Sequence, residues 1–239
     1  MTTTPELDSI LEWMKAHEDE TNKAGMARFG IETRHAFGIS IAQLKPLVKQ
    51  YRKQHALALA LWATGKHEAR LLAALIDDPK QVTEAQMEEW ARDFDSWDVV
   101  DQCCNKLFDK TPFTYAKALE WSARPETFVK RAGFVLMATL AVHDKKADEA
   151  QIAAFLPIIE REAADERNFV KKAVNWALRQ IGKRSLSLNE QAIATARRIE
   201  QHESKAARWV AKDALRELTR ETTQYRLRTP IRERRKAKG

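Results

Sequence analysis

Glycine, aromatic residues and long apolar runs are all scarce in this chain of 239 residues. It has only 7 glycines, whereas Ala, Leu, Glu, Lys and Arg recur in long runs, and this composition favours helix nearly everywhere. No uninterrupted apolar run approaches the ~18 residues that a transmembrane helix needs. The N-terminus, MTTTPELDSILEWMKAH, carries acids where a signal peptide needs a basic segment followed by an apolar core. We therefore expect neither a membrane protein nor a secreted one.

Cysteine and cofactor motifs are also scarce. The only two cysteines, Cys103 and Cys104, are adjacent, and neighbours on a helix point about 100° apart, so we expect no disulfide between them. We interpret both as small buried side chains. The six histidines show no zinc-type spacing, and neither GxGxxG nor GxxxxGK occurs. The sequence thus predicts a cytoplasmic chain with no metal and no cofactor.

Positive charge is in excess, but it is unevenly distributed along the chain. Residues 1–100 carry 12 Lys and Arg against 16 Asp and Glu, and residues 101–225 carry 22 against 17. The last fourteen residues, RLRTPIRERRKAKG, carry 7 against 1. We expect residues 226–239 to form a basic, disordered tail. Such a tail is either a solvated terminus or an arm that binds phosphates.

Helix start signals recur through the sequence. In TPEL, Thr4 is the expected N-cap and Pro5 the first helical residue. TEAQ (83–86) and SLNE (187–190) have the pattern of capping boxes, and TPF (111–113) and RPE (124–126) indicate two further starts. Apolar residues recur between them every three to four positions, which predicts about a dozen helices joined in pairs by short loops. Pro157 should kink one of them.

Five segments share a similar pattern of apolar and charged residues. They are HEARLLAALI (67–76), WDVVDQCCNKL (97–107), FVKRAGFVLMATL (128–140), FVKKAVNWALRQIGK (169–183) and KAARWVAKDALREL (205–218). Alignment places one residue of each in a common slot, at intervals of 31, 30, 41 and 36 residues: Arg70, Asp101, Arg131, Lys172 and Arg208. Such spacing is near one helical hairpin per unit. We therefore predict an all-α fold, an α-solenoid of HEAT-like hairpins over residues 1–225, whose second helices line a concave basic face.

One slot of this register differs in charge. Asp101 stands where the other slots hold Arg or Lys, and Trp97 lies one turn earlier on the same helix face. In a later segment Lys172, Trp176 and Arg179 are spaced i, i+4, i+7. Cations on one face suit a phosphate backbone. A carboxylate among them weakens non-specific DNA binding, so Asp101 needs another role.

Structural explanations remain open for each of these residues. Trp97 and Trp176 are consistent with core packing, as isolated tryptophans often are. Asp101 is consistent with ordinary helix N-terminus electrostatics, although Ser96 and Asp98 already serve that purpose. Arg131 is consistent with a surface ion pair.

With these residues the chain resembles the bacterial DNA alkylation-repair glycosylases of the AlkD type, which are HEAT-like α-solenoids. The likeness extends from GMARFGI through the FGIS turn to about residue 220, and it is clearest in SWDVVDQCCNKLF, FVKRAGFVLMATL and FVKKAVNWALRQIGK. It implies that the catalytic residues are Trp97, Asp101, Arg131 and Trp176. The resemblance also implies DNA contacts for Phe29, where Tyr is usual in the family, and for Arg179. We expect Lys172 and Arg208 to contact DNA as well, because they occupy the common slot. The family's tandem Trp appears here as Ser96-Trp97.

The chemistry that this resemblance implies gives Asp101 a role. An N3- or N7-alkylated purine is cationic and already a good leaving group, so one of the two carboxylates of a typical glycosidase is dispensable. Asp101 would stabilise the oxocarbenium-like sugar and orient or deprotonate water. The implied activity is release of 3-methyladenine or 7-methylguanine from duplex DNA by a monomer.

Two other functions fit the same residues. A non-catalytic solenoid that binds damaged or branched DNA would use the cations and release no base. A protein-interaction scaffold would bury Trp97 and Trp176 between helices and disperse the cations over the surface.

Overall fold

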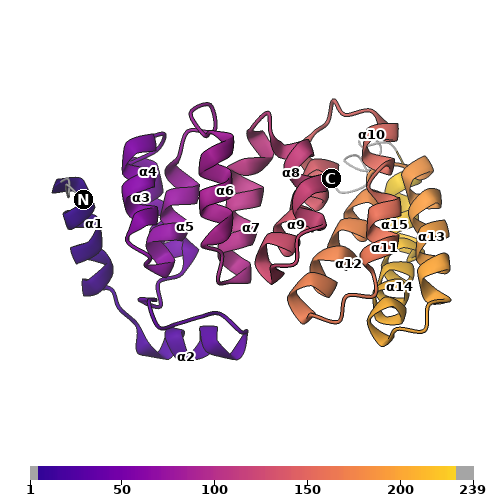
Figure 1. Cartoon of the computed structure of the whole chain (residues 1–239), viewed down its shortest axis with the longest axis horizontal. Coiled ribbons are helices and arrows are strands. Elements are labelled where there is room, and N and C mark those ends of the chain that lie inside the picture. Colours follow the sequence, from indigo (N-terminus) through magenta and orange to yellow (C-terminus); the bar gives the residue numbers. More distant parts are fainter. Residues whose placement is uncertain (1–4, 230–239) are drawn as a thin grey trace, which may run out of the picture. The chain divides into compact units, whose positions relative to one another are not determined.

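In a computed structural model of the chain, residues 5–229 are described (Figure 1). These residues form helices and no strands, so the predicted all-α class is confirmed. None of the described helices is long and apolar enough to cross a membrane. The sequence predicts one domain over residues 1–225. We describe its two compact units in turn: unit 1 (Met1–Thr114) and unit 2 (Tyr115–Gly239).

Unit 1 is built around α5, which packs against α3, α4 and α7. Its helices are α1 (Pro5–Ala16), α2 (Glu20–Arg28), α3 (Ile41–Gln50), α4 (His55–Ala63), α5 (His67–Ile76), α6 (Glu84–Arg92), α7 (Trp97–Lys106) and the 3-10 helix η1 (Phe108–Lys110). Every apolar residue of α5 except Leu75 is buried, and stacked aromatic rings extend the core toward α6. The rings of Trp62 and Trp90 lie parallel with centroids 4.0 Å apart. Aromatic area of this size stabilises a core strongly.

Unit 2 is built around α12, which packs against α9, α13 and α14. Its helices are α8 (Thr114–Ser122), α9 (Thr127–His143), α10 (Glu149–Ala153), α11 (Leu156–Glu162), α12 (Asn168–Gly182), α13 (Leu186–Glu200), α14 (Lys205–Leu218) and α15 (Glu221–Arg228). The close approach of α8 to α9 depends on Gly133, because a Cβ there would lie 2.4 Å from the backbone nitrogen of Ser122. Any other residue would push the two helices apart.

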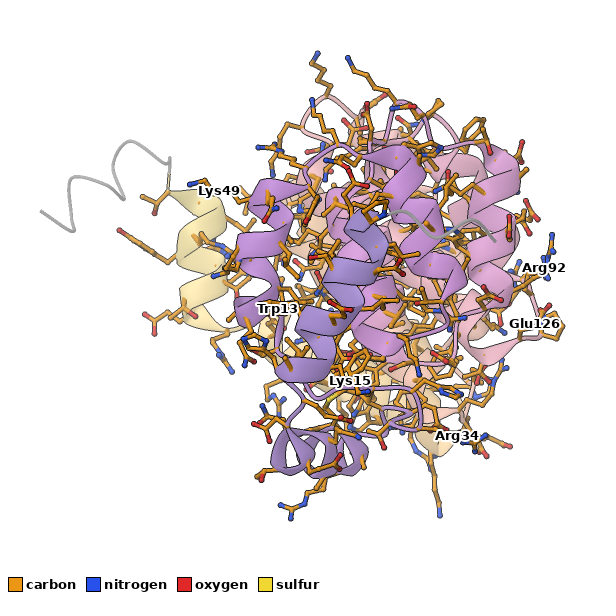
Figure 2. The ribbon with its side chains drawn as sticks, turned by 90° about the vertical axis from the view of Figure 1, so that its left-hand side faces the viewer. Trp13, Lys15, Arg34, Lys49, Arg92 and Glu126 are labelled. Atoms are coloured by element: carbon orange, nitrogen blue, oxygen red, sulfur yellow. The ribbon has the colours of Figure 1, made fainter. Side chains whose placement is uncertain are left out.

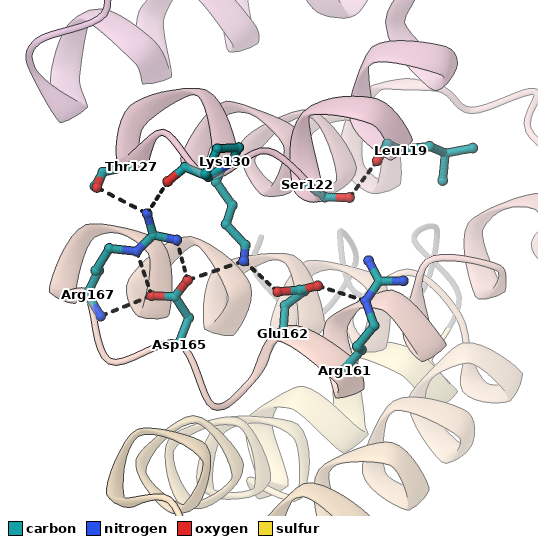
Figure 3. Close-up of polar contacts among 9 residues, drawn as sticks. Leu119, Ser122, Thr127, Lys130, Arg161, Glu162, Asp165 and Arg167 are labelled. Carbon is teal, nitrogen blue, oxygen red and sulfur yellow. Dashed lines mark hydrogen bonds and ion pairs between the residues drawn. The ribbon is translucent and has the colours of Figure 1, made fainter.

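An ion-pair network holds the loop before α12 against α9 (Figure 3). Lys130 on α9 lies 2.5 Å from Glu162 and 3.3 Å from Asp165. Arg167 donates to both oxygens of Asp165 and to the backbone carbonyl of Pro125 at 2.5 Å. Burial by itself would raise the pKa of Asp165, but these hydrogen bonds outweigh it and the pKa is lowered. The network fixes the start of the helix that carries Trp176.

Most helix starts follow the sequence signals, but neither of the two predicted capping boxes is complete. Thr83 caps α6 by accepting a hydrogen bond from the backbone N–H of Gln86 at 3.1 Å, but the side chain of Gln86 donates to Asp77 at 2.7 Å, so the capping box predicted at TEAQ makes only one of its two bonds. The capping box expected at SLNE is wrong. Ser185 is the N-cap of α13 and Ser187 lies inside the helix, because the hydroxyl of Ser185 accepts from the backbone N–H of Leu188 at 3.2 Å.

Proline also differs from its predicted role. Pro157 lies in the first turn of α11, where no backbone N–H is needed, so it begins a helix rather than kinking one. The predicted cap Thr4 lies outside the described residues. Helix α15 continues to Arg228, so residues 226–228 are helical, whereas the tail from residue 230 also lies outside the described part.

The common slot predicted from the sequence falls at equivalent places in the helices. Each slot residue is the fourth or fifth residue of its helix: Arg70 in α5, Asp101 in α7, Arg131 in α9, Lys172 in α12 and Arg208 in α14. Within unit 1, α5 packs on α7, and within unit 2, α12 packs on both α9 and α14. The repeat of second helices is therefore confirmed inside each unit. A concave basic face common to both units stays a prediction.

Candidate nucleic-acid interface

Helix α7 has one buried face and one accessible face. Trp97 opens the helix, and Asp101 lies one turn later on the same side. Both side chains are half-buried. The opposite face is closed in the core by residues that are at most 1% exposed: Val99, Val100, Cys103 and Cys104. Trp97 and Asp101 thus lie on the partly exposed face of α7, and Trp97 is not sealed in the core.

The structure brings Trp97 together with Phe29. The indole Nε1 of Trp97 donates a hydrogen bond to the backbone carbonyl of Phe29 at 3.1 Å. Phe29 caps the C-terminus of α2, and its side chain is 72% exposed. Both residues line a pocket of about 480 Å³, whose other walls are mainly apolar and include Met26 and Ile41. Trp97, assigned to catalysis, and Phe29, assigned to DNA contact, therefore line one pocket within unit 1.

A buried carboxylate shapes the wall of this pocket. Glu68 is fully buried and accepts hydrogen bonds from the backbone N–H groups of Phe37, Gly38 and Ile39 at 2.8, 2.7 and 3.1 Å. Gly38 has a φ of +80°, and a Cβ on it would lie 2.2 Å from the backbone oxygen of Asp19. Only glycine fits there without strain. The FGIS turn is therefore held in one conformation.

A buried histidine–aspartate pair also lines the pocket, and sequence reasoning missed it. The Nε2 atom of His67 lies 2.9 Å from an oxygen of Asp98. Burial by itself would lower the pKa of His67, but the hydrogen bond to Asp98 and its charge outweigh burial and raise that pKa. For Asp98, burial by itself would raise the pKa, and the contacts with His67 lower it. The hydroxyl of Ser96 donates to Asp98, so Ser96 occupies the N-cap position without making a capping bond.

Arg131 in unit 2 is a buried guanidinium rather than a surface one. Its side chain lies in α9 and is only 6% exposed. The Nη1 atom donates to the backbone carbonyl of Phe169, in the first turn of α12, at 2.7 Å. The bond fixes the direction of the guanidinium across the α9–α12 contact. Because the side chain of Arg131 is buried, the surface ion pair that the sequence left open does not describe this residue.

The three residues predicted to form a stripe along α12 differ in their exposure to solvent. Lys172 is exposed, and Trp176 and Arg179 are half-buried. Arg179 pairs with Glu217 of α14, with Nη1 and the carboxylate oxygen 2.5 Å apart. The carboxylate offsets much of the charge that Arg179 would offer to DNA. Lys172 is therefore the exposed cation of this stripe, and residues 5–229 provide no ion pair for it.

Helix α14 adds an exposed cation and an unexpected aromatic residue. Arg208 is exposed, as its predicted DNA contact requires. Its neighbour Trp209 is 41% exposed, and the Nζ atom of Lys171 lies 5.0 Å from the centroid of its ring. Sequence reasoning missed this cation–π pair because the two residues come from different helices.

No metal or thiol chemistry is indicated in the described part of the chain. Within residues 5–229, no group of three His, Cys, Asp or Glu side chains is placed to hold a metal ion. Neither Cys103 nor Cys104 forms a disulfide within residues 5–229, and both are fully buried, which confirms the interpretation of their packing. Burial raises the pKa of the Cys103 thiol well above its usual range, so the reactive thiolate is disfavoured.

Comparison with known proteins identifies the family. The model of the family described as DNA alkylation repair enzyme matches residues 10–218. The chain belongs to this family. No curated protein matches the chain. A solved structure is similar with a TM-score of 0.75 and 20% identity, over 92% of this chain and 95% of the other. It represents "a new family of proteins related to the HEAT-like repeat DNA glycosylases with affinity for branched DNA structures". At 20% identity, the similarity shows that this chain and the solved protein share a fold. The HEAT-like architecture predicted from the sequence agrees with that fold.

Proposed function

We propose that the chain is a DNA glycosylase that hydrolyses the N-glycosidic bond of cationic alkylated purines, 3-methyladenine and 7-methylguanine, in duplex DNA. The observation that carries this proposal is the accessible face of α7. It presents the carboxylate of Asp101 one turn from an indole, Trp97, whose orientation a hydrogen bond to Phe29 fixes. Membership of the DNA alkylation repair family supports the same class of substrate.

The proposed reaction needs a carboxylate and no external acid. The N-glycosidic bond breaks with its electron pair passing to the alkylated base, whose positive charge is thereby neutralised. The sugar develops oxocarbenium character and is attacked by water, which loses its proton to Asp101. A carboxylate beside the developing cation in a partly dry site contributes on the order of a few kcal/mol. The face of Trp97 would contribute ~0.5–2 kcal/mol through contact with the cationic nucleotide.

Unit 2 is proposed to hold the DNA backbone and the second aromatic contact. Arg131 would bind a phosphate of the DNA backbone, and Trp176 would contact a nucleotide. Lys172 and Arg208 are exposed and would neutralise phosphates on either side. Arg179 would contribute less to the salt dependence of binding, because Glu217 offsets its charge.

The direct test is base release. Purified protein is incubated with methylated duplex DNA and, separately, with uracil-containing duplex, and the free base is quantified. A glycosylase of this kind releases 3-methyladenine or 7-methylguanine and leaves uracil in place, because only the alkylated purines are cationic. Absence of released alkylpurine at saturating protein contradicts the proposal.

A second function is favoured by one specific observation. The solved structure that covers most of this chain has affinity for branched DNA structures. If the present chain acts in the same way, it binds a branched junction more tightly than a linear duplex, releases no base, and is indifferent to Asp101→Asn. The base-release assay and a competition between branched and linear DNA separate the two functions.

A further inference from the structure

A second cavity lies entirely within unit 2, and its lining includes residues from the ends of α9 and α12 and the N-cap of α13. Its volume is about 560 Å³. Four cationic side chains line it against a single carboxylate, Glu149: Lys145, Lys183, Arg184 and Arg226. None of the residues assigned to catalysis or DNA contact lines this cavity.

The four cations differ in how they are held. Arg184 donates to the backbone carbonyls of Ala141 and Ala147 at 2.9 and 3.0 Å, which fixes its guanidinium in the wall. Lys183 pairs with Glu217 at 2.7 Å. Lys145 and Arg226 are exposed, and residues 5–229 provide neither side chain with a hydrogen bond or ion pair. The cavity therefore has a fixed cationic wall and two cations available to a ligand.

The start of α13 adds to this potential. Ser185 lines the cavity and caps a helix of 15 residues. The positive end of a helix dipole and the N–H groups of its first turn favour an anion. The ligand chemistry that fits the lining is therefore a phosphate group rather than a cation or an apolar molecule.

The cavity also continues the stripe of α12. Lys172, Trp176, Arg179 and Lys183 are spaced i, i+4, i+7 and i+11, so they follow one face of the helix. From Trp176 to Lys183 the helix rises about 10 Å. A nucleic-acid strand that follows this face reaches the cavity within a few nucleotides of Trp176.

We propose that this cavity binds a phosphate of the DNA backbone, as an anchor beyond the residues assigned to the lesion. The proposal rests on the DNA binding that both candidate functions share, and it does not require glycosylase activity. Lys145 and Arg226 supply the mobile cations of the anchor, and Arg184 and the start of α13 supply its fixed part.

The test compares two double variants that remove the same charge. Lys145→Ala/Arg226→Ala removes the available cations of the cavity. Lys49→Ala/Arg92→Ala removes two exposed cations of unit 1 (Figure 2). Binding of a labelled duplex is measured as a function of salt, and base release is measured at saturating DNA. Circular dichroism confirms that both variants are folded, as expected for exposed side chains.

One lost phosphate contact lowers the slope of log affinity against log salt by about 0.9. When the salt concentration rises from about 50 to about 200 mM, both proteins lose affinity for the duplex. The factor by which the cavity variant loses affinity should be about 3- to 4-fold smaller than the factor for the wild type. The unit 1 variant should keep the wild-type slope, and base release at saturation should be unchanged in both. Equal slopes in the two double variants, or a wild-type slope in the cavity variant, overturn the proposal.

A second arm separates the DNA backbone from a free phosphate compound. Thermal unfolding is followed in inorganic phosphate and in chloride at equal ionic strength. If phosphate stabilises the wild type and not the cavity variant while the DNA slopes are equal, the cavity binds a small phosphate compound and the DNA anchor is wrong. If the slopes differ as expected but no base is released, the anchor stands and the glycosylase proposal fails.

Discussion

The indole of Trp97 and the backbone carbonyl of Phe29 are joined by a hydrogen bond of 3.1 Å, although the two residues are 68 positions apart. The bond links the first residue of α7 to the C-cap of α2. Helix α2 has no buried residue of its own, so its position depends on contacts of this kind. The exposed ring of Phe29 is therefore placed by the same tryptophan that lies one turn from Asp101.

Replacing Trp97 with Phe should loosen α2. The variant keeps an aromatic ring but loses the donor to Phe29, a contribution of ~1 kcal/mol. Amide hydrogen exchange over residues 20–31 should become faster, while exchange in α5 stays unchanged. Trp13→Phe is the matched control, because Trp13 lies on α1 and its ring stacks on that of His17, four residues later in the chain. Unchanged exchange in α2 of the Trp97 variant would mean that other contacts hold this helix.

Glu68→Gln should destabilise unit 1. The carboxylate accepts three backbone N–H groups, and an amide would turn its own N–H₂ toward at least one of them. The free energy of unfolding should fall by ~2–3 kcal/mol. Urea denaturation measures this, with the exposed Glu89→Gln as the control. Equal stability of the two variants would show that the FGIS turn does not depend on the buried charge.

The pair of His67 and Asp98 should make stability depend on pH. The folded-state pKa of His67 is raised, so its contribution is complete below about pH 6.5 and is lost as the pH rises through the raised value. The folded-state pKa of Asp98 is lowered, so its contribution is complete above about pH 4 and is lost as the pH falls through the lowered value. The difference in unfolding free energy between wild type and His67→Gln should therefore be largest between about pH 4 and about pH 6.5.

Urea denaturation across this range measures the difference, and it should shrink at higher pH. His35→Gln is the control, because His35 is exposed and its ring has no hydrogen bond within the described residues. A difference that is constant with pH would show that His67 is neutral in the folded protein.

Arg131→Ala should change both stability and DNA binding. The carbonyl of Phe169 loses its donor, which costs ~1 kcal/mol of stability. If Arg131 also binds a phosphate, the slope of log affinity against log salt should fall by about 0.9. The exposed Arg197→Ala on α13 should change neither quantity. A loss of stability with an unaltered slope would make Arg131 a structural residue only.

The fold was predictable because its signals are local. The 3.6-residue periodicity and the slot shared by Arg70, Asp101, Arg131, Lys172 and Arg208 fall at equivalent places in five helices. The errors concern competition between neighbouring signals. Ser185 and Ser187 both precede a helical run, and a polar residue in the first turn looks like a cap when the earlier one is overlooked.

The environment of the candidate site was less predictable because it depends on distant partners. The sequence left core packing of Trp97 open, and the structure shows it half-buried, with a bond to Phe29 that no local pattern indicates. The burial of Arg131 and the pairing of Arg179 with Glu217, 38 residues away, follow only from the packing of α12 on its neighbours. Periodicity assigns a residue to a helix face and does not reveal which opposite charge meets it there.

The central claim is that Asp101 acts chemically on a bound lesion. Asp101→Asn keeps the shape of the side chain and removes its charge, so the decisive measurement pairs two readouts on this one variant: the rate of alkylpurine release from methylated duplex at saturating protein, and affinity for the same duplex. We predict that release falls by at least about 100-fold, a barrier increase of about 2.7 kcal/mol, while affinity changes less than about 3-fold. Release at the wild-type rate, or loss of both quantities to the same extent, would contradict the catalytic role of Asp101.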